Sequence, residues 1–287
     1  MRIAVLLMGM DHEVFPIVKD RILSQFECEG IAFDFFAHTW DEIIEELTST
    51  NDDWSDISSK FVKKNIPFPY NDGRIKNYKT SSYQEIYDNY ISMDGISHIV
   101  TQNRMVFFIN FIAQSLSTYH AFKALEEYKT QNEVEYDMVI KWRWDLVFDP
   151  NGQHMLNKLK EYKKNNIYST HIDTDQMSDV WWGSDYETFK VIINDLPRYM
   201  AFSISNALAV SANLWHEHFM LESIKKIAAE RKLELVFSSE VVFPPNTIIR
   251  PRPGLNGNED FSDIHIYNHH WKNKMNNPMW AGRIIKR

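Results

Sequence analysis

The first apolar run of the chain constrains the fold most. Residues 3–8 read IAVLLM without a polar residue, and Gly9 ends the run. A strand has this pattern when both of its faces are buried, as in a parallel sheet covered by helices. A second apolar run follows at residues 31–37, after a predicted helix at about residues 11–26. This strand–helix–strand order predicts two neighbouring parallel strands in an α/β fold.

The rest of the chain continues this alternation. Asp185 is expected to cap the helix that follows it, because its carboxylate can accept hydrogen bonds from the free amides of a first helical turn. The segment at about 48–97 is polar and rich in turn residues, so we expect an insertion with short helices in a single domain spanning 1–287. Helices are predicted at 103–128 and 214–232, and strands at 136–148, 167–169, 178–184, 233–237 and 247–250.

Charge and cysteine content exclude several classes of protein. The formal net charge of -8 argues against a general nucleic-acid binder. Cys28 is the single cysteine, so an internal disulfide is impossible and a cytoplasmic protein is expected. The apolar run at 3–8 is too short to span a membrane. The basic residues near the C-terminus are expected to form a solvated tail, with weak contact to an anionic membrane surface as the alternative.

Several common catalytic motifs are missing from the sequence. The turn after residue 8 has no G-x-G-x-x-G pattern, and the chain contains no Walker loop and no G-x-S-x-G elbow. Residues 216–218 read HEH, which lacks the H-E-x-x-H spacing of zinc proteases. These absences argue against common dehydrogenases, P-loop enzymes and serine hydrolases.

The predicted strand at 136–148 changes from apolar to charged along its length. Lys141, Arg143 and Asp145 lie in its second half. Ligands of open α/β sheets bind at the carboxyl ends of the strands, so these side chains are candidates for one site. Asp145 could hold Mg²⁺ or Mn²⁺, and the two cations could bind phosphate oxygens. An ordinary ion pair between Arg143 and Asp145 is the alternative.

This segment carries a family resemblance. Residues 136–146 read YDMVIKWRWDL and resemble the YDxVIRxRxDL strand of a group of bacterial and viral GT-A-like glycosyltransferases and polysaccharide-biosynthesis proteins. In the same order along the chain, residues 3–9 resemble the first strand and glycine turn of that group, and AHTWD at 37–41 resembles its hHTWD segment. SDVWWGS at 178–184 resembles its sDxfxfGs segment, and HEHFM at 216–220 falls where the group has PExlL.

The resemblance implies a GT-A-like, Rossmann-related α/β domain with a mainly parallel central sheet flanked by helices. It implies transfer of a hexosyl group from a nucleoside diphosphate sugar to a hydroxyl of a glycan or lipid-linked acceptor. The chain departs from the group at the metal strand, where Arg143 replaces the first Asp of Asp-x-Asp, and Lys141 stands where the group has Arg.

Further roles follow from the resemblance alone. Gly9 would let the nucleotide approach the backbone, or it is a plain turn glycine. Asp41 would contact the base or ribose, or it caps a following helix. Asp179 would bind hydroxyls of the donor sugar. Trp181 and Trp182 would line the acceptor side, although strand alternation predicts that they point to opposite faces and cannot both line one pocket.

The resemblance also implies a divalent cation, Mn²⁺ or Mg²⁺. Asp145 and a late histidine, His265 or His269, would hold it, since imidazole and carboxylate suit these ions. The alternative for the histidines is an ordinary polar surface role. Because Arg143 replaces an acidic residue, direct neutralisation of the diphosphate by cationic side chains remains a second possibility.

Glu217 is the candidate general base. It precedes the apolar positions Met220, Ile224 and Ile227, so it is expected in a first helical turn. It would accept the proton of the acceptor hydroxyl, or it only stabilises the helix; His216 and His218 compete for the same role. Two other functions stay open: a non-catalytic carbohydrate or nucleotide-sugar binding protein, and a glycoside hydrolase that uses Asp145 and Glu217.

Overall fold

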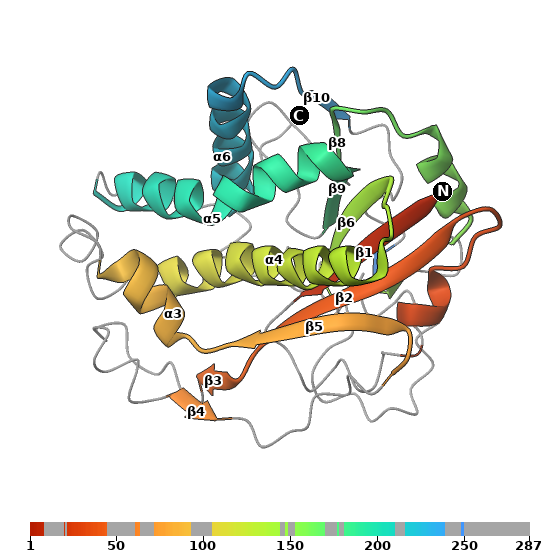
Figure 1. Cartoon of the computed structure of the whole chain (residues 1–287). Coiled ribbons are helices and arrows are strands. Elements are labelled where there is room, and N and C mark those ends of the chain that lie inside the picture. The colour runs from red at the N-terminus through yellow and green to blue at the C-terminus, as the bar shows by residue number, and fades with distance from the viewer. Residues whose placement is uncertain are drawn as a thin grey trace, which may run out of the picture.

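The computed structural model describes residues 1–8, 20, 22–44, 61–63, 72–92, 105–143, 147–148, 153–169, 177, 181–209, 216–238 and 248–249. Its main feature is a seven-stranded sheet with the order β10-β8-β9-β6-β1-β2-β5 (Figure 1). The strands are β1 (Arg2–Met8), β2 (Ala32–Trp40), β5 (Ile75–Ser81), β6 (Met138–Arg143), β8 (Asn166–Ser169), β9 (Trp181–Asp185) and β10 (Val236–Ser238).

The sheet is mainly parallel, as the apolar runs predict. β1 pairs in parallel with β2 on one side and with β6 on the other, and all its residues after Arg2 are buried. β2 pairs in parallel with β5, and β8 with β10. β9 alone runs antiparallel to its neighbours β6 and β8. A central strand that is covered on both faces explains the unbroken apolar sequence of residues 3–8.

Helices cover both faces of the sheet. Three long helices lie on one side, α4 (Met105–Asn132), α5 (Tyr186–Ala209) and α6 (His216–Arg231). α5 packs against both α4 and α6, and α4 lies across β1, β2 and β5 (Figure 1). We call this side the α4 face. The opposite face is covered by the helical residues 22–25 and by the 3-10 helix η3 (Gln153–Glu161). The expected α/β architecture, a mainly parallel sheet flanked by helices, is confirmed.

Alternation along β6 divides the core into two layers. Val139 belongs to the cluster under α4, α5 and α6, whereas Ile140 and Trp142 belong to the cluster on the opposite face. Lys141 is two residues beyond Val139, so its side chain starts toward the α4 face. One strand therefore presents an ammonium group to one layer and only apolar groups to the other.

The strand predicted at 136–148 is wrong as one continuous element. β6 ends at Arg143, and β7 (Val147–Phe148) pairs antiparallel with β11 (Ile248–Ile249) in a separate two-stranded sheet. The side-chain alternation of β6 therefore cannot be extended to Asp145, which lies outside the described residues. Strand-forming residues look alike whichever strand they pair with. The sequence pattern therefore does not reveal that residues 138–143 and 147–148 belong to different sheets.

The polar segment at 48–97 contributes to the central sheet as well as to its surroundings. Within it, β4 (Phe61–Lys63) pairs with β3 (Glu42–Ile44), and β5 forms the edge strand beside β2. Short helical elements follow, α3 (Gln84–Ile86) and the π-helix η1 (Tyr87–Ile91). β5 alternates between less and more exposed positions, as an edge strand with one solvated side does.

Two local features of β9 match its sequence. Asp185 ends the strand and caps α5, since its Oδ1 accepts a hydrogen bond of 3.1 Å from the backbone N–H of Thr188, as predicted. Gly183 lies so close to β6 that a Cβ atom there would be 2.9 Å from the Val139 carbonyl oxygen. The close pairing of β9 with β6 therefore needs a glycine at this position.

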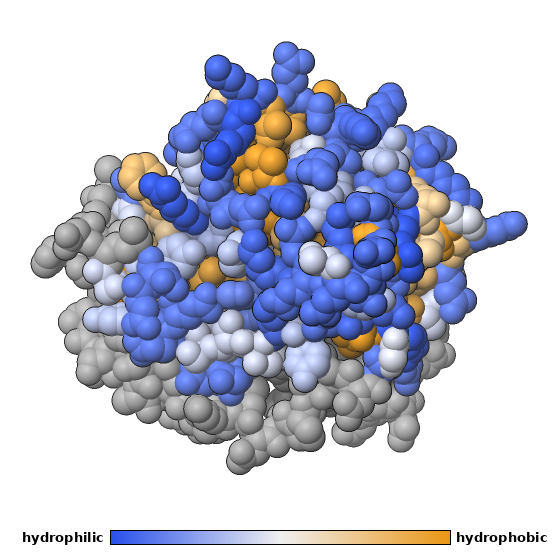
Figure 2. Space-filling view, viewed as in Figure 1, coloured by the Kyte–Doolittle hydropathy of each residue, from blue (hydrophilic) through white to orange (hydrophobic). Residues whose placement is uncertain are grey.

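The surface above α4 is mostly hydrophilic. Figure 2 shows this side of the molecule, with its largest apolar area beside α6 and smaller apolar areas elsewhere. Among the described residues, no helix combines the length and apolar character that a membrane span requires.

Candidate functional site

The carboxyl ends of the parallel strands carry a row of polar side chains. The sheet register aligns Arg143 of β6 with Met8 of β1, Met8 with His38 of β2, and His38 with Lys79 of β5. Arg143 is the last residue of its strand. In open α/β sheets this edge is where ligands bind. The register thus places Arg143 at the edge that the fold offers to a ligand, whereas Lys79 at the same edge is ion-paired with Glu127.

Lys141 lines a small chamber between the sheet and the three helices. Its side chain is 2% exposed, and its strand neighbours are Leu6 of β1 and Trp182 of β9. The chamber leaves room for about one water molecule. Its walls come from α4, β6, β9, α5 and α6, and the lining residues are Gln114, Ser115, Thr118, Lys141, Trp182, Leu196, Met200, His216 and Met220.

The α4 wall of the chamber offers hydrogen-bond acceptors. The Ser115 hydroxyl donates to the Ile112 carbonyl oxygen at 2.9 Å, and the Thr118 hydroxyl donates to the Gln114 carbonyl oxygen at 3.0 Å. Their protons are thereby used, and their lone pairs remain. The Oε1 atom of Gln114 is buried without a hydrogen-bond partner among the described residues. This wall therefore suits a group that can donate a hydrogen bond.

A second polar cluster lies beside the chamber on the α4 face. His38 is fully buried, and its Nδ1 is 2.7 Å from the Ser117 hydroxyl oxygen. Its ring stacks on His120 at a centroid distance of 4.9 Å. His120 Nε2 lies 2.8 Å and 2.9 Å from the two carboxylate oxygens of Glu85. This cluster ties the helical turn of α3 to β2 and α4.

The contact with His120 lowers the pKa of the Glu85 carboxyl. Burial acts to raise its pKa, but the hydrogen bond and charge of His120 outweigh burial and lower the pKa below its ordinary value. Nearby, burial raises the pKa of Tyr83, whose ring stacks on Trp40 at 4.8 Å. The carboxylate is thus held in its charged form next to the histidine pair.

Of the predicted phosphate partners, Arg143 lies at the edge described above and Lys141 lies two residues before it, while one alternative for Asp41 is contradicted. Lys141 and Arg143 are on the same face of β6, two residues apart. Asp41 follows β2 directly, and its backbone N–H donates to the Ser81 carbonyl oxygen at 2.9 Å. The idea that Asp41 caps a helix is wrong, because residues 42–44 form the strand β3.

The two predicted acceptor-side tryptophans are separated by the sheet. Trp182 lines the chamber and stacks on Phe189 of α5 at 4.3 Å. Trp181 is 0% exposed within the cluster of the opposite face. The two rings therefore do not line one pocket, in agreement with the alternation of a regular strand.

Glu217 is in the first turn of α6, as expected, but its side chain is outside the described residues. Gly9, Asp145, Asp179, His265 and His269 also lie outside them, so their predicted roles remain predictions. In the part of the chain that the structure describes, no group of three or more His, Cys, Asp or Glu side chains could hold a metal ion.

The structure adds residues that sequence reasoning passed over. Gln114, Ser115 and Thr118 all face the chamber from the middle of α4. The signal was the polar run QSLST at 114–118, which follows the mainly apolar residues 105–113 of the same helix. Polar residues at buried helical positions need partners, so this interruption of the apolar stripe indicates a polar site against the sheet.

Comparisons with known proteins do not assign this chain to a family. No protein-family model matches the chain, and no curated protein matches it. Among solved structures, the apo form of mouse xyloside xylosyltransferase 1 is similar over 83% of this chain and 84% of its own, with 8% sequence identity and a TM-score of 0.35. A likeness of this size carries no conclusion about the activity of this chain.

Proposed function

We propose that this chain is a GT-A-like glycosyltransferase that moves a sugar from a nucleoside diphosphate sugar to a hydroxyl of a glycan or lipid-linked acceptor. The observation that carries the proposal is the cationic end of the central strand β6. Lys141 and Arg143 share one face of this strand at the carboxyl edge of a mainly parallel sheet. An anionic diphosphate is the kind of ligand that this edge and these charges favour.

The physical reason concerns the leaving group. When the sugar is transferred, the bond between its anomeric carbon and the diphosphate breaks, and negative charge accumulates on the diphosphate. Positively charged groups placed before the reaction stabilise that charge more in the transition state than in the ground state. Arg143 can bind two phosphate oxygens in its planar fork, and Lys141 adds a point charge from the partly apolar chamber.

The remaining predicted roles complete the proposal. Asp145, with His265 or His269, would hold Mn²⁺ or Mg²⁺ against the diphosphate, and the cation would supply further charge neutralisation. Gly9, Asp41 and Asp179 would contact the nucleotide and donor sugar. Trp182 would lie on the acceptor side, and Glu217 would be the base unless His216 takes that role.

A screen of nucleotide sugars tests the proposal. We expect one nucleoside diphosphate sugar to raise the melting temperature of the wild-type protein and to release its diphosphate in the presence of an acceptor. At a hundredfold excess over the dissociation constant, binding should stabilise the fold by about 2.7 kcal/mol. Stabilisation without release would indicate a non-catalytic binding protein. If no donor stabilises the protein or releases diphosphate, the proposal is wrong.

Two variants distinguish diphosphate binding through a metal ion from diphosphate binding through cationic side chains. Asp145→Asn should remove most transfer activity while the fold remains intact. Arg143→Gln should weaken diphosphate binding by about tenfold or more, the effect of losing a charged hydrogen bond worth ~1.5–3 kcal/mol. Equal calorimetric affinity for the diphosphate in Mn²⁺ and in chelator would assign its binding to Arg143 and Lys141 rather than to a metal.

A further inference from the structure

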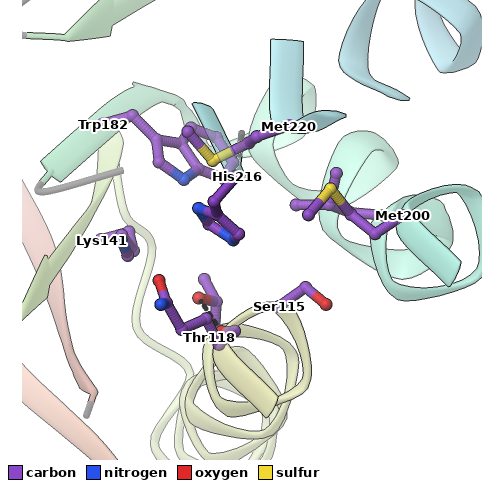
Figure 3. A pocket seen from close by; sticks show the side chains of 9 residues that line it. Ser115, Thr118, Lys141, Trp182, Met200, His216 and Met220 are labelled. Atoms are coloured by element: carbon purple, nitrogen blue, oxygen red, sulfur yellow. Dashed lines mark hydrogen bonds between the residues drawn. The ribbon is translucent and has the colours of Figure 1, made fainter. Parts of the chain in front are cut away.

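The chamber beside Lys141 brings a histidine into contact with the proposed donor site. His216 is the first residue of α6 and is 7% exposed. In Figure 3 its imidazole points into the space between Lys141 of β6 and the residues Ser115 and Thr118 of α4. His218, two residues further on, is partly exposed and does not line the chamber. The structure therefore separates the two histidines that the sequence leaves equivalent.

Three features of the surroundings favour the uncharged form of the His216 imidazole. Burial disfavours any charged group, and the side chains of Leu196, Met200 and Met220 make one side of the chamber apolar. The Lys141 ammonium group lines the same chamber and would repel an imidazolium ion. The N-terminal end of a helix carries a partial positive charge, which also opposes a cation there. A neutral imidazole has a lone pair that can accept a proton.

The size and lining of the chamber fit one hydroxyl group. There is room for about one water molecule. Gln114 Oε1 and the lone pairs of Ser115 and Thr118 can accept hydrogen bonds from a group in the chamber. Met200 and Met220 have flexible thioether side chains that can adapt to an entering group. A hydroxyl can donate to this wall or to the imidazole and can accept from Lys141.

We propose that His216 is the general base of the transfer reaction, and that the chamber receives the hydroxyl of the acceptor. This inference rests on the proposed glycosyltransferase function. The acceptor oxygen forms a bond to the anomeric carbon of the donor, and the bond from that carbon to the diphosphate oxygen breaks. The electron pair of the broken bond leaves with the diphosphate, next to Lys141, while the hydroxyl proton moves to the imidazole. His216 later releases this proton to solvent.

The chemistry favours His216 over Glu217 for this step. A carboxylate in the first turn of a helix is stabilised in its charged form and is therefore a weaker base. An imidazole that is neutral near physiological pH is the stronger base of the two and can accept a proton at its unprotonated ring nitrogen. The extra positive charge that His216 acquires beside Lys141 is offset by the negative charge that develops on the departing diphosphate.

The protonation state can be measured without any substrate. Long-range ¹H–¹⁵N correlation spectra of the full-length protein report the protonation of each histidine ring. We expect the His216 ring to titrate below ~6.5, the ordinary histidine value, and to be neutral at about pH 7. The ring signal that is missing from the spectrum of the His216→Asn variant is the signal of His216. A ring that is already an imidazolium ion at pH 7 would overturn the proposal.

Kinetics then test the catalytic role. His216→Asn should lower the transfer rate by about 10²-fold or more, the usual scale for loss of a general base, and leave the affinity for the nucleoside diphosphate unchanged. The matched control His218→Asn should transfer at the wild-type rate. The low-pH limb of the wild-type rate profile should disappear in His216→Asn. If His216→Asn does not fold, His216→Gln and the wild-type pH profile carry the test.

The outcomes distinguish this inference from the proposed function. If the wild-type protein binds no diphosphate and transfers no sugar, the glycosyltransferase proposal itself has failed. If the wild type is active and His216→Asn keeps its rate, only the role of His216 is wrong. Loss of transfer in Glu217→Gln together with normal transfer in His216→Asn would assign the base to Glu217 instead.

Discussion

The two faces of strand β6 differ although they share one backbone. On the opposite face, Ile140 and Trp142 are fully buried, and Trp142 packs edge-on against Phe26 at 5.3 Å. On the α4 face, Lys141 is buried among Gln114, His216 and other polar groups. Burying polar groups costs free energy unless they find partners, so the polar groups on this face need hydrogen-bond or charge partners. The α4 face also holds an extensive apolar cluster that includes Val139, so the two faces of β6 differ in the polar surroundings of Lys141 and not in whether they are packed.

The largest expected effect tests the structural role of the opposite face. Trp142→Ala should lower the free energy of unfolding by ~3–5 kcal/mol, the cost of removing a large buried aromatic side chain. Urea unfolding monitored by circular dichroism measures the change. Trp142→Phe is the conservative control and should cost less. A loss below ~1 kcal/mol would show that the opposite face does not hold the sheet together as described.

The next largest effect is expected where β9 pairs with β6, the strand whose two faces are compared above. Gly183→Ala should cost ~1–3 kcal/mol, because the new methyl group would meet the Val139 carbonyl oxygen at 2.9 Å and the backbone must shift. The control is Gly73→Ala, where nothing lies within 4 Å of the added atom. Equal melting temperatures of the two variants would contradict the close pairing of β9 with β6.

A smaller effect is expected where β9 ends and α5 begins. Asp185→Ala should cost ~1 kcal/mol, since the first turn of α5 loses the carboxylate that accepts from the Thr188 amide. Asp185→Asn should recover part of this stability, because asparagine also caps helices but cannot replace both the oxygen that accepts from Thr188 and the one that accepts from the Asn165 amide at 2.7 Å. The two variants are compared by thermal unfolding. Similar losses in both would mean that capping is not what Asp185 contributes.

The smallest effect is the pH dependence of the Glu85–His120 contact on the α4 face. The pKa of Glu85 is lowered in the folded protein, so its contribution to stability is present above the unfolded value of ~4.3 and is lost as the pH falls through the folded pKa. Glu85→Gln should therefore flatten the stability profile below about pH 4 to 5. Parallel profiles for wild type and variant would contradict this assignment.

The sequence predicts the sheet better than it predicts the site. Residues 3–8, 31–37 and the first half of 136–148 are apolar because both faces of these strands are buried, so their pattern identifies β1, β2 and β6. β5 was missed because an edge strand is half solvated and its sequence resembles that of a polar insertion. Local patterns give no information about which strand it joins.

The chamber could be predicted only in part, for a similar reason. Lys141 is conspicuous because a cation interrupts an apolar strand. Ser115 and Thr118 are ordinary residues in the sequence, and only the packing of α4 across β1 and β2 brings them near Lys141. His216 was distinguished from His218 only by the direction in which each side chain leaves α6.

The most direct test of the central claim is the affinity of a nucleoside diphosphate for three proteins, measured by calorimetry: wild type, Lys141→Met and Lys79→Met. Lys79 lies at the same edge of the sheet but pairs with Glu127 at 2.6 Å. We expect saturable binding to the wild type, an affinity at least about tenfold lower in Lys141→Met, and unchanged affinity in Lys79→Met. Wild-type affinity in Lys141→Met, or equal weakening in both variants, would contradict the assignment of the α4 face of β6 to the donor.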